Sequence, residues 1–326
     1  MVSELMNTEN KQWKSFEEQL QLLKSRGLLV DDEQAALDYL ERIGYYRLSG
    51  YWYSFRQLIL STTEAGKVEY YRKDEFAEHS HFEDAVKLYV FDKKLRLLAM
   101  DALERIELAV RVDIAHLLGE IDTYAHHNPT VFHGNFAKRK IKSGKHKGQT
   151  EHELWLDYYE YVLHRARREP YVKHYMVKYR KLPIWVAVET WDFGMMSKIY
   201  AGMSVKHKGV IAHKYGVTDW KVFEGWLKSL NFIRNVSAHH SRLWNINVLE
   251  LSKPTDLDEY WQRLDNTRPF FYFCVIQALM NTICPNSHWK KRFISLIDEF
   301  PAPKSNTVKV SDFGLIEDWK NWGLWR

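Results

Sequence analysis

The stretch LRLLAMDALERIELAVRVDIAHLLG, residues 95–119, has the clearest structural pattern in this chain. Its apolar residues recur every three or four positions, which is the spacing of one face of an α-helix. The stripe consists of Leu95, Ala99, Ala102, Leu103, Ile106, Val110, Ile114 and Leu117. We therefore predict a long amphipathic helix. It begins near Ser80, because Ser80 and Glu83 are spaced as in a capping box, and Gly119 can end it.

Shorter segments on both sides of this helix have the same periodicity. They predict helices over residues 13–27, 35–43, 150–169, 220–238, 257–284 and 287–299. Residues 57–60 and 67–71, separated by TTEAG, indicate a short β-hairpin. We predict a mainly α fold: a helical bundle with an N-terminal helical extension that contains this hairpin. The expected domains are residues 1–78, residues 79–300 with a basic insertion around 133–150, and a linker with a docked Trp-rich tail over 301–326.

Composition excludes several classes of protein. With 326 residues, 45% of them hydrophobic and 15% aromatic, the chain can build a packed core and is not a disordered protein. No uninterrupted apolar stretch approaches the length of a membrane-spanning helix, and residues 1–14 are too polar for a signal peptide. Two cysteines make neither a disulfide framework nor a four-cysteine zinc site. We expect a cytoplasmic protein that does not enter a membrane.

Positive charge is concentrated in one part of the chain. The overall net charge is +5, yet residues 133–181 hold 13 lysines and arginines against five acids, so the rest is net negative. A concentrated positive surface is typical of proteins that contact phosphates. The densest run is a candidate RNA-binding loop or a solvated loop, and both readings stay open. Its cations are Lys138, Arg139, Lys140, Lys142, Lys145 and Lys147.

The segment NFIRNVSAHHSRLWN, residues 231–245, changes abruptly from an apolar helix to polar side chains. His239 titrates near neutrality and can exchange protons with the 2′-hydroxyl or the leaving oxygen of RNA. Arg234 can stabilise charge on the phosphate, and Asn235 can orient either group. On an ideal helix Arg234 and His239 are about 140° apart, so they share one groove only if the helix tightens or bends near Ser237. A structural alternative is that Arg234 and His239 only cap the helix, because the helix dipole favours cations at its C-terminal end.

Two further observations concern charged and metal-binding side chains. Glu107 and Arg111 form an i,i+4 pair on the long helix, either a surface ion pair or part of a cleft. The His126-His127 and His239-His240 pairs lack the spacing of a helical metal site, and phosphate-binding glycine loops are absent from the sequence. We therefore assign no metal ligand and no cofactor.

Four segments of the chain together resemble a known family. Arg234 and His239 have the R-x4-H spacing of HEPN domains, and the wider pattern resembles the Abi-family abortive infection proteins of the AbiD/AbiF type. The segments that carry this resemblance are residues 45–52 (YYRLSGYW), 89–98 (YVFDKKLRLL), 104–111 (ERIELAVR) and 234–245. The resemblance extends over about residues 15–300. Arg111 and His116 also satisfy R-x4-H, which we interpret as coincidence.

The resemblance implies a bacterial anti-phage protein with a HEPN-like domain and endoribonuclease activity. It assigns catalytic places to Arg234 and His239 and the adjacent polar place to Asn235. Supporting places in the cleft go to His240, Arg242, Asn245, Glu107 and Arg111. Because HEPN nucleases usually pair two domains, it also implies a homodimer with a composite site. The partners would be substrate RNA and a regulatory small RNA. The alternative is a non-catalytic RNA-binding module that holds a small RNA or senses a phage product.

Overall fold

The structure is a computed structural model that describes residues 12–62 and 68–326. It is mainly helical, with a two-stranded antiparallel hairpin near the N-terminus, as predicted. The chain divides into two compact units. The first contains residues up to Lys93 together with Ile297–Val310, and the second contains Lys94–Leu296 and Ser311–Arg326. The predicted domains 1–78, 79–300 and 301–326 stay a prediction beside this division.

The first unit is built from three short helices and the hairpin. Its helices are α1 (Phe16–Ser25), α2 (Glu33–Ile43) and α3 (Tyr45–Trp52), and its strands are β1 (Arg56–Thr62) and β2 (Val68–Phe76). The strands pair in antiparallel register from Arg56 opposite Phe76 to Thr62 opposite Val68. They are longer than the predicted segments, and part of the predicted turn, with Lys67, lies outside the described residues.

Helix α4 (Phe82–Ile121) is the long helix expected from the apolar stripe. Seven of the eight predicted stripe residues are buried; at the C-terminal end Leu118, rather than Leu117, is fully buried. Ser80 and Glu83 do not form the expected capping box at the start of α4. The Ser80 hydroxyl donates to the Phe55 carbonyl at 3.4 Å, and the Glu83 carboxylate accepts from the Asp31 N–H, in the loop before α2, at 3.0 Å. Their spacing reflects packing between segments and not a local cap.

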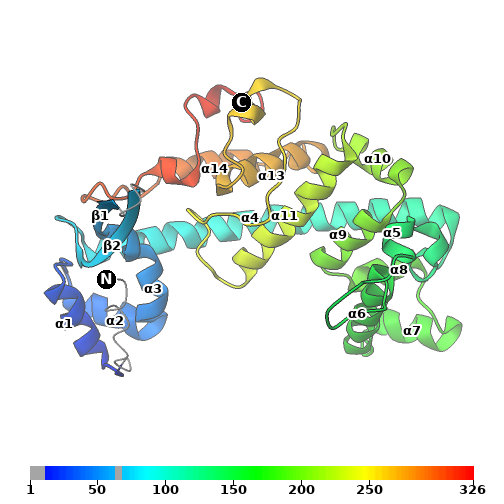
Figure 1. Cartoon of the computed structure of the whole chain (residues 1–326), viewed down its shortest axis with the longest axis horizontal. Helices are drawn as coiled ribbons and strands as arrows, with labels where there is room; N and C mark the ends of the chain where they lie inside the picture. Colours follow the sequence, from blue (N-terminus) through cyan, green and yellow to red (C-terminus); the bar gives the residue numbers. More distant parts are fainter. Residues whose placement is uncertain (1–11, 63–67) are drawn as a thin grey trace. The chain divides into compact units, whose positions relative to one another are not determined.

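The second unit is a helical assembly around the C-terminal part of α4. Its first helices are α5 (Gly134–Ala137), α6 (Glu151–Arg165), α7 (Pro170–Tyr179), α8 (Ile184–Ala187) and α9 (Phe193–Gly202). The remaining ones are α10 (Val205–Lys214), α11 (Trp220–Ala238), α12 (Glu259–Arg263), α13 (Pro269–Ile283) and α14 (Trp289–Asp298). Helix α9 packs against α6 and α11, and α5, α6, α8 and α9 gather near the end of α4 (Figure 1).

The single helix predicted over residues 257–284 is wrong. The chain leaves α12 at Leu264 and re-enters a helix at Pro269, the first residue of α13. Between them the Asp265 carboxylate accepts from the Thr267 backbone N–H at 2.8 Å, which is a local turn. Proline lacks an N–H and is favoured at the first position of a helix, so it starts α13 instead of continuing α12.

The Trp-rich tail docks on the second unit, as predicted. The ring centroid of Trp325 lies 4.7 Å from that of Phe293 in α14, and Trp322 donates from its indole nitrogen to Asp258 at 2.7 Å. Trp319 lies edge-to-face with Phe270 at 5.4 Å. These rings extend the core around α13. Among the described helices, none has the length and apolar character needed to cross a bilayer.

Candidate functional site

Helix α11 carries the predicted catalytic segment and has the predicted bounds. Asp219 caps its first turn by accepting from the Lys221 N–H at 2.8 Å. At the other end the His240 N–H donates to the Ser237 carbonyl and the Ser241 N–H to the Val236 carbonyl, while His240 has a φ of 58°. This is a Schellman ending with histidine at the left-handed position, where glycine is usual. The strained backbone therefore lies directly beside His239.

Arg234 and Asn235 line a polar pocket of about 260 Å³ between α6, α9 and α11. The Arg234 guanidinium donates to the Asn235 side-chain oxygen at 3.0 Å. Asn231 lines the same pocket, because positions i, i+3 and i+4 share one face of a helix. The structure thus brings two of the three predicted catalytic side chains together, beside a third α11 residue that the sequence reasoning did not select.

Asp192, Tyr158 and Lys198 also line this pocket. One carboxylate oxygen of Asp192 caps α9 by accepting from the Met195 N–H at 2.8 Å, and the other accepts from the Tyr158 hydroxyl at 3.0 Å. The negative charge of Asp192 raises the pKa of the Tyr158 hydroxyl. This aspartate is therefore held in place from two sides within the pocket that Arg234 lines.

Sequence reasoning missed Asp192, Tyr158, Lys198 and Asn231. A local signal existed for two of them: Asp192 precedes a helical run as an N-cap residue, and Asn231 shares the face of Arg234. Tyr158 and Lys198 carry no such signal, since their positions depend on how α6 and α9 pack against α11.

Glu107 and Arg111 form a largely buried ion pair, with side chains 13% and 12% exposed. Arg111 donates to the Glu107 carboxylate and also to the backbone carbonyl of Trp191, next to Asp192. Burial raises the pKa of Glu107, and the positive charges of Arg111 and Arg234 act in the opposite direction by lowering it. The pair is therefore not an ordinary surface ion pair: it is largely buried, and Arg234 is close enough to affect the Glu107 carboxylate.

The remaining motif residues lie toward the C-terminal end of α11 and beyond it. His239 and His240 are exposed, whereas Arg242 and Asn245 are half-buried. His239 is not among the described residues that line the pocket of Arg234. One copy of the chain therefore brings Arg234 and Asn235 to one place and leaves the His239 imidazole outside it.

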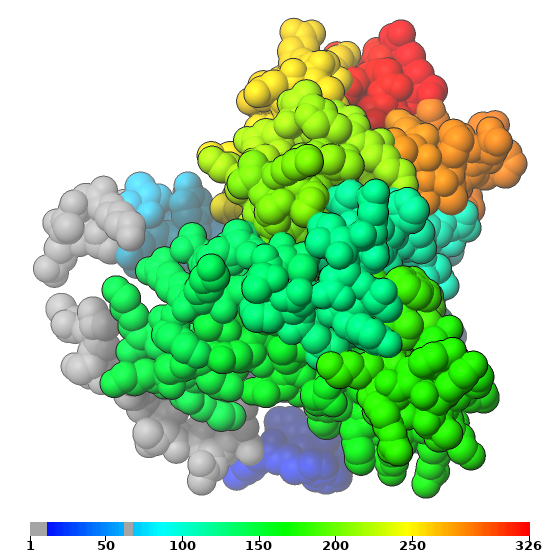
Figure 2. All heavy atoms as spheres, turned by 90° about the vertical axis from the view of Figure 1, so that its right-hand side faces the viewer, coloured from blue at the N-terminus to red at the C-terminus, as the bar shows by residue number. Residues whose placement is uncertain are grey.

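The basic loop after α5 is exposed along its length. It is closed by hydrogen bonds of 2.8 and 3.0 Å that join the backbone of Ile141 to Gln149 and Gly148. Lys140 pairs with Glu153 at 2.9 Å, and Glu153 also completes a capping box with Thr150 at the start of α6. The six predicted cations, from Lys138 to Lys147, all have exposed side chains. The green segments around residue 150, which include this loop, lie open on the face in Figure 2.

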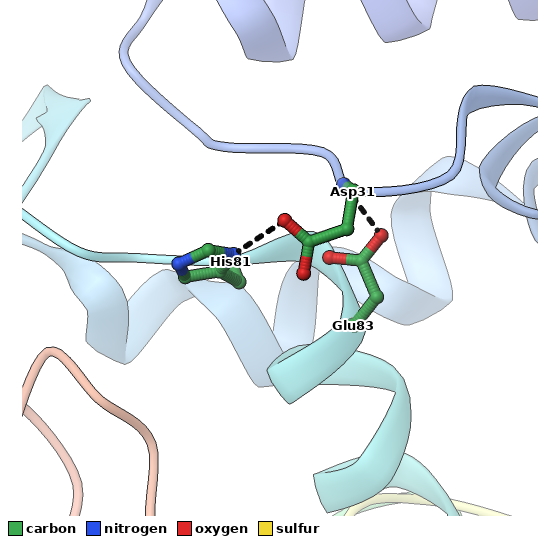
Figure 3. Close-up of side chains that lie close together, drawn as sticks. All are labelled: Asp31, His81 and Glu83. Carbon is green, nitrogen blue, oxygen red and sulfur yellow. Dashed lines mark hydrogen bonds and ion pairs between the residues drawn. The ribbon is translucent and has the colours of Figure 1, made fainter.

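The surroundings of His126 and His81 are relevant to whether either histidine could bind a metal ion. His126 is buried among aromatic rings, and this burial lowers its pKa to about 3. In the first unit, Asp31, His81 and Glu83 offer ligand atoms within 4.8 Å of one another (Figure 3). The Asp31 carboxylate contacts the His81 ring at 3.1 Å, and Glu83 accepts from the Asp31 N–H at 3.0 Å. These bonds fasten the loop before α2 to the start of α4.

The family described as Abi-like protein matches residues 38–245, which include Glu107, Arg111, Arg234 and His239. The comparisons with curated proteins and with solved structures give no match. The AbiD/AbiF type and the HEPN-like domain stay predictions. Because the family match covers more than half of its residues, the chain belongs to the Abi-like protein family.

Proposed function

We propose that this protein is a metal-independent endoribonuclease of the HEPN type that acts in abortive infection. One observation carries the proposal: α11 presents Arg234 and Asn235 to a polar pocket and ends at an exposed His239. Membership in a family described as Abi-like supports the biological setting. The strained backbone at His240 supports a functional end to this helix, because such strain tends to persist at active sites.

The chemistry is a transesterification within the RNA chain. A base takes the proton of the ribose 2′-hydroxyl, the 2′-oxygen forms a bond to phosphorus, and the bond from phosphorus to the 5′-oxygen breaks. The leaving 5′-oxygen takes a proton, so the products are a 2′,3′-cyclic phosphate and a 5′-hydroxyl. We assign proton transfer to His239 and stabilisation of the phosphorane charge to Arg234. Asn235 orients the guanidinium that it accepts from.

The separation of His239 from the Arg234 pocket supports a site shared between two copies. In a homodimer, His239 of one protomer would complete the pocket of its partner. Mixing Arg234→Ala with His239→Ala protomers tests this arrangement. If the two residues act in trans, each mixed dimer regains one intact site and cleaves RNA, although either variant alone does not. Two inactive variants that stay inactive after mixing and re-association would refute the shared site.

The central experiment is induction of the wild type and of Arg234→Ala in a bacterium, followed by sequencing of total RNA ends. We expect new cleavage ends and growth arrest with the wild type, and neither with Arg234→Ala. His116→Ala is the matched control for His239→Ala, because His116 belongs to the other R-x4-H match and is also exposed. Matching end profiles for wild type and Arg234→Ala would remove the nuclease assignment.

The alternative is a non-catalytic RNA-binding module, favoured by the exposed basic loop. Phosphate contacts supply affinity without chemistry. The two functions differ for His239→Ala: a nuclease loses toxicity and cleavage but keeps its affinity for RNA, whereas a binding module keeps its phenotype. Cleavage that EDTA abolishes would indicate a metal nuclease and contradict the assignment to Arg234 and His239.

A further inference from the structure

An aromatic pocket of about 900 Å³ lies within the first unit, between α1, α3 and the start of the hairpin. Trp13, Tyr46 and Tyr53 line it. All three residues are exposed, Tyr46 at 91%, Trp13 at 86% and Tyr53 at 49%. Large aromatic residues normally bury much of their surface, so a set of exposed rings around one hollow is a candidate binding site.

Helix α3 explains why the Tyr46 ring is exposed. The unit's core uses the opposite face of α3, where Leu48, Tyr51 and Trp52 are at most 2% exposed. Tyr51 also donates its hydroxyl to Asp92 at 2.7 Å. Tyr46 is not part of this packing, so the stability of the unit does not account for an aromatic residue at this position.

Cationic side chains line the same pocket. Arg26 and Arg56 line the pocket, and both pair with the single carboxylate of Asp74, at 2.6 and 2.9 Å. Two guanidiniums share one negative charge, so the pair retains a net positive charge. The guanidiniums of Arg56 and Arg72 also lie 5.7 and 5.9 Å from the centre of the Tyr53 ring. The pocket thus combines flat apolar rings with an excess of cations.

We propose that this pocket binds unpaired nucleotides of single-stranded RNA, with bases stacked on Tyr46 and Trp13 and a phosphate near Arg26 and Arg56. The proposal rests on the proposed function, from which it takes RNA as the ligand. Stacking requires exposed faces of bases, which a single strand offers and a duplex does not. Arginine forks match phosphate oxygens. The site is distinct in sequence from the Arg234 pocket, which α6, α9 and α11 form in the second unit.

The test measures RNA affinity in the full chain carrying Arg234→Ala, so that cleavage does not interfere. The probe is a labelled single-stranded oligoribonucleotide, and the readout is fluorescence anisotropy. Adding Tyr46→Ala should weaken binding about 5- to 150-fold, the range for loss of one stacked base. Tyr46→Phe should retain the affinity because it keeps the ring. Tyr70→Ala is the matched control, since Tyr70 is 67% exposed on β2 and does not line the pocket.

Two results would overturn the stacking site. One is Tyr46→Ala binding as tightly as Tyr70→Ala, and the other is equal affinity of the parent for the oligoribonucleotide and for an abasic version of it. A separate experiment tests the nuclease assignment: sequencing of the RNA ends produced by the wild type and by Arg234→Ala. Either proposal can therefore fail while the other stands.

Discussion

Replacing Arg111 with methionine tests the interpretation of the Glu107–Arg111 pair. The change removes the guanidinium that contacts both the Glu107 carboxylate and the Trp191 carbonyl. The side chains of Glu107 and Arg111 are only 13% and 12% exposed, so the Glu107 carboxylate would be left largely buried without the positive charge closest to it. Leaving one partner of a buried pair unpaired costs about 3–5 kcal/mol. We therefore expect Arg111→Met to lower the free energy of unfolding by about that amount at pH 8.

The matched control is Arg105→Met on the same helix. Arg105 pairs with Asp101 at the same i,i+4 spacing, but the side chains are 41% and 29% exposed, and Asp101 keeps Arg292 as a second partner. An exposed pair of this kind contributes about 0–1 kcal/mol. Urea denaturation followed by circular dichroism compares the two variants. Equal losses for Arg111→Met and Arg105→Met would refute the reasoning.

The pH dependence adds a second check on the same residue. Burial already raises the pKa of Glu107, and loss of Arg111 removes a charge that lowers it. In the unfolded chain such a carboxyl releases its proton once the pH exceeds the ordinary pKa of glutamate. In the folded protein, where its pKa is raised, it either keeps the proton or ionises at a cost, so the carboxyl destabilises the fold at high pH. The deficit of Arg111→Met should shrink from pH 8 to pH 5. Adding Glu107→Gln to Arg111→Met should recover much of the lost free energy of unfolding at pH 8. A double variant as unstable as Arg111→Met alone would contradict the view that the unpaired Glu107 carboxylate causes the loss.

Two further predictions concern packing and pH. A methyl group at Gly202 would lie 2.5 Å from the ring of Phe136, so Gly202→Ala should cost about 1–3 kcal/mol in thermal denaturation. Gly209→Ala, where nothing lies within 4 Å, should instead stabilise α10 by about 0.5–1 kcal/mol, and equal effects of the two changes would contradict the contact. The pKa of His126 is lowered to about 3, so its contribution to stability is complete above pH 6.5 and is lost as the pH falls below that value. Wild type should lose about 1.4 kcal/mol per pH unit more than His126→Phe between pH 6 and 4, and parallel curves in urea denaturation would exclude this.

Local patterns predicted the helices that govern the candidate site. Helix α11 has the bounds predicted from the apolar periodicity, with Asp219 as its cap. Helix α6 begins where it was predicted to begin, after a capping box of Thr150 and Glu153, and ends at Arg165, four residues before the predicted end. The prediction ran a helix across residues 265–268, although these residues (DNTR) are all polar and Pro269 cannot continue a helix. In the structure the turn at Asp265 separates α12 from α13. Capping and periodicity depend on neighbours within a few residues, which the sequence shows directly.

Local sequence patterns were enough to predict the mainly helical fold, the end of α11 and the residues that resemble an Abi-type site. They did not show that Asp192 and Tyr158 join Arg234 in a pocket, that Glu107 and Arg111 are largely buried, or that Tyr46 is exposed to solvent. The reason is physical: helix formation is set by short-range hydrogen bonds and periodicity, whereas a site is set by which faces of distant helices pack together. Such packing depends on the shapes of all the side chains between the helices, and no short stretch of sequence contains that information.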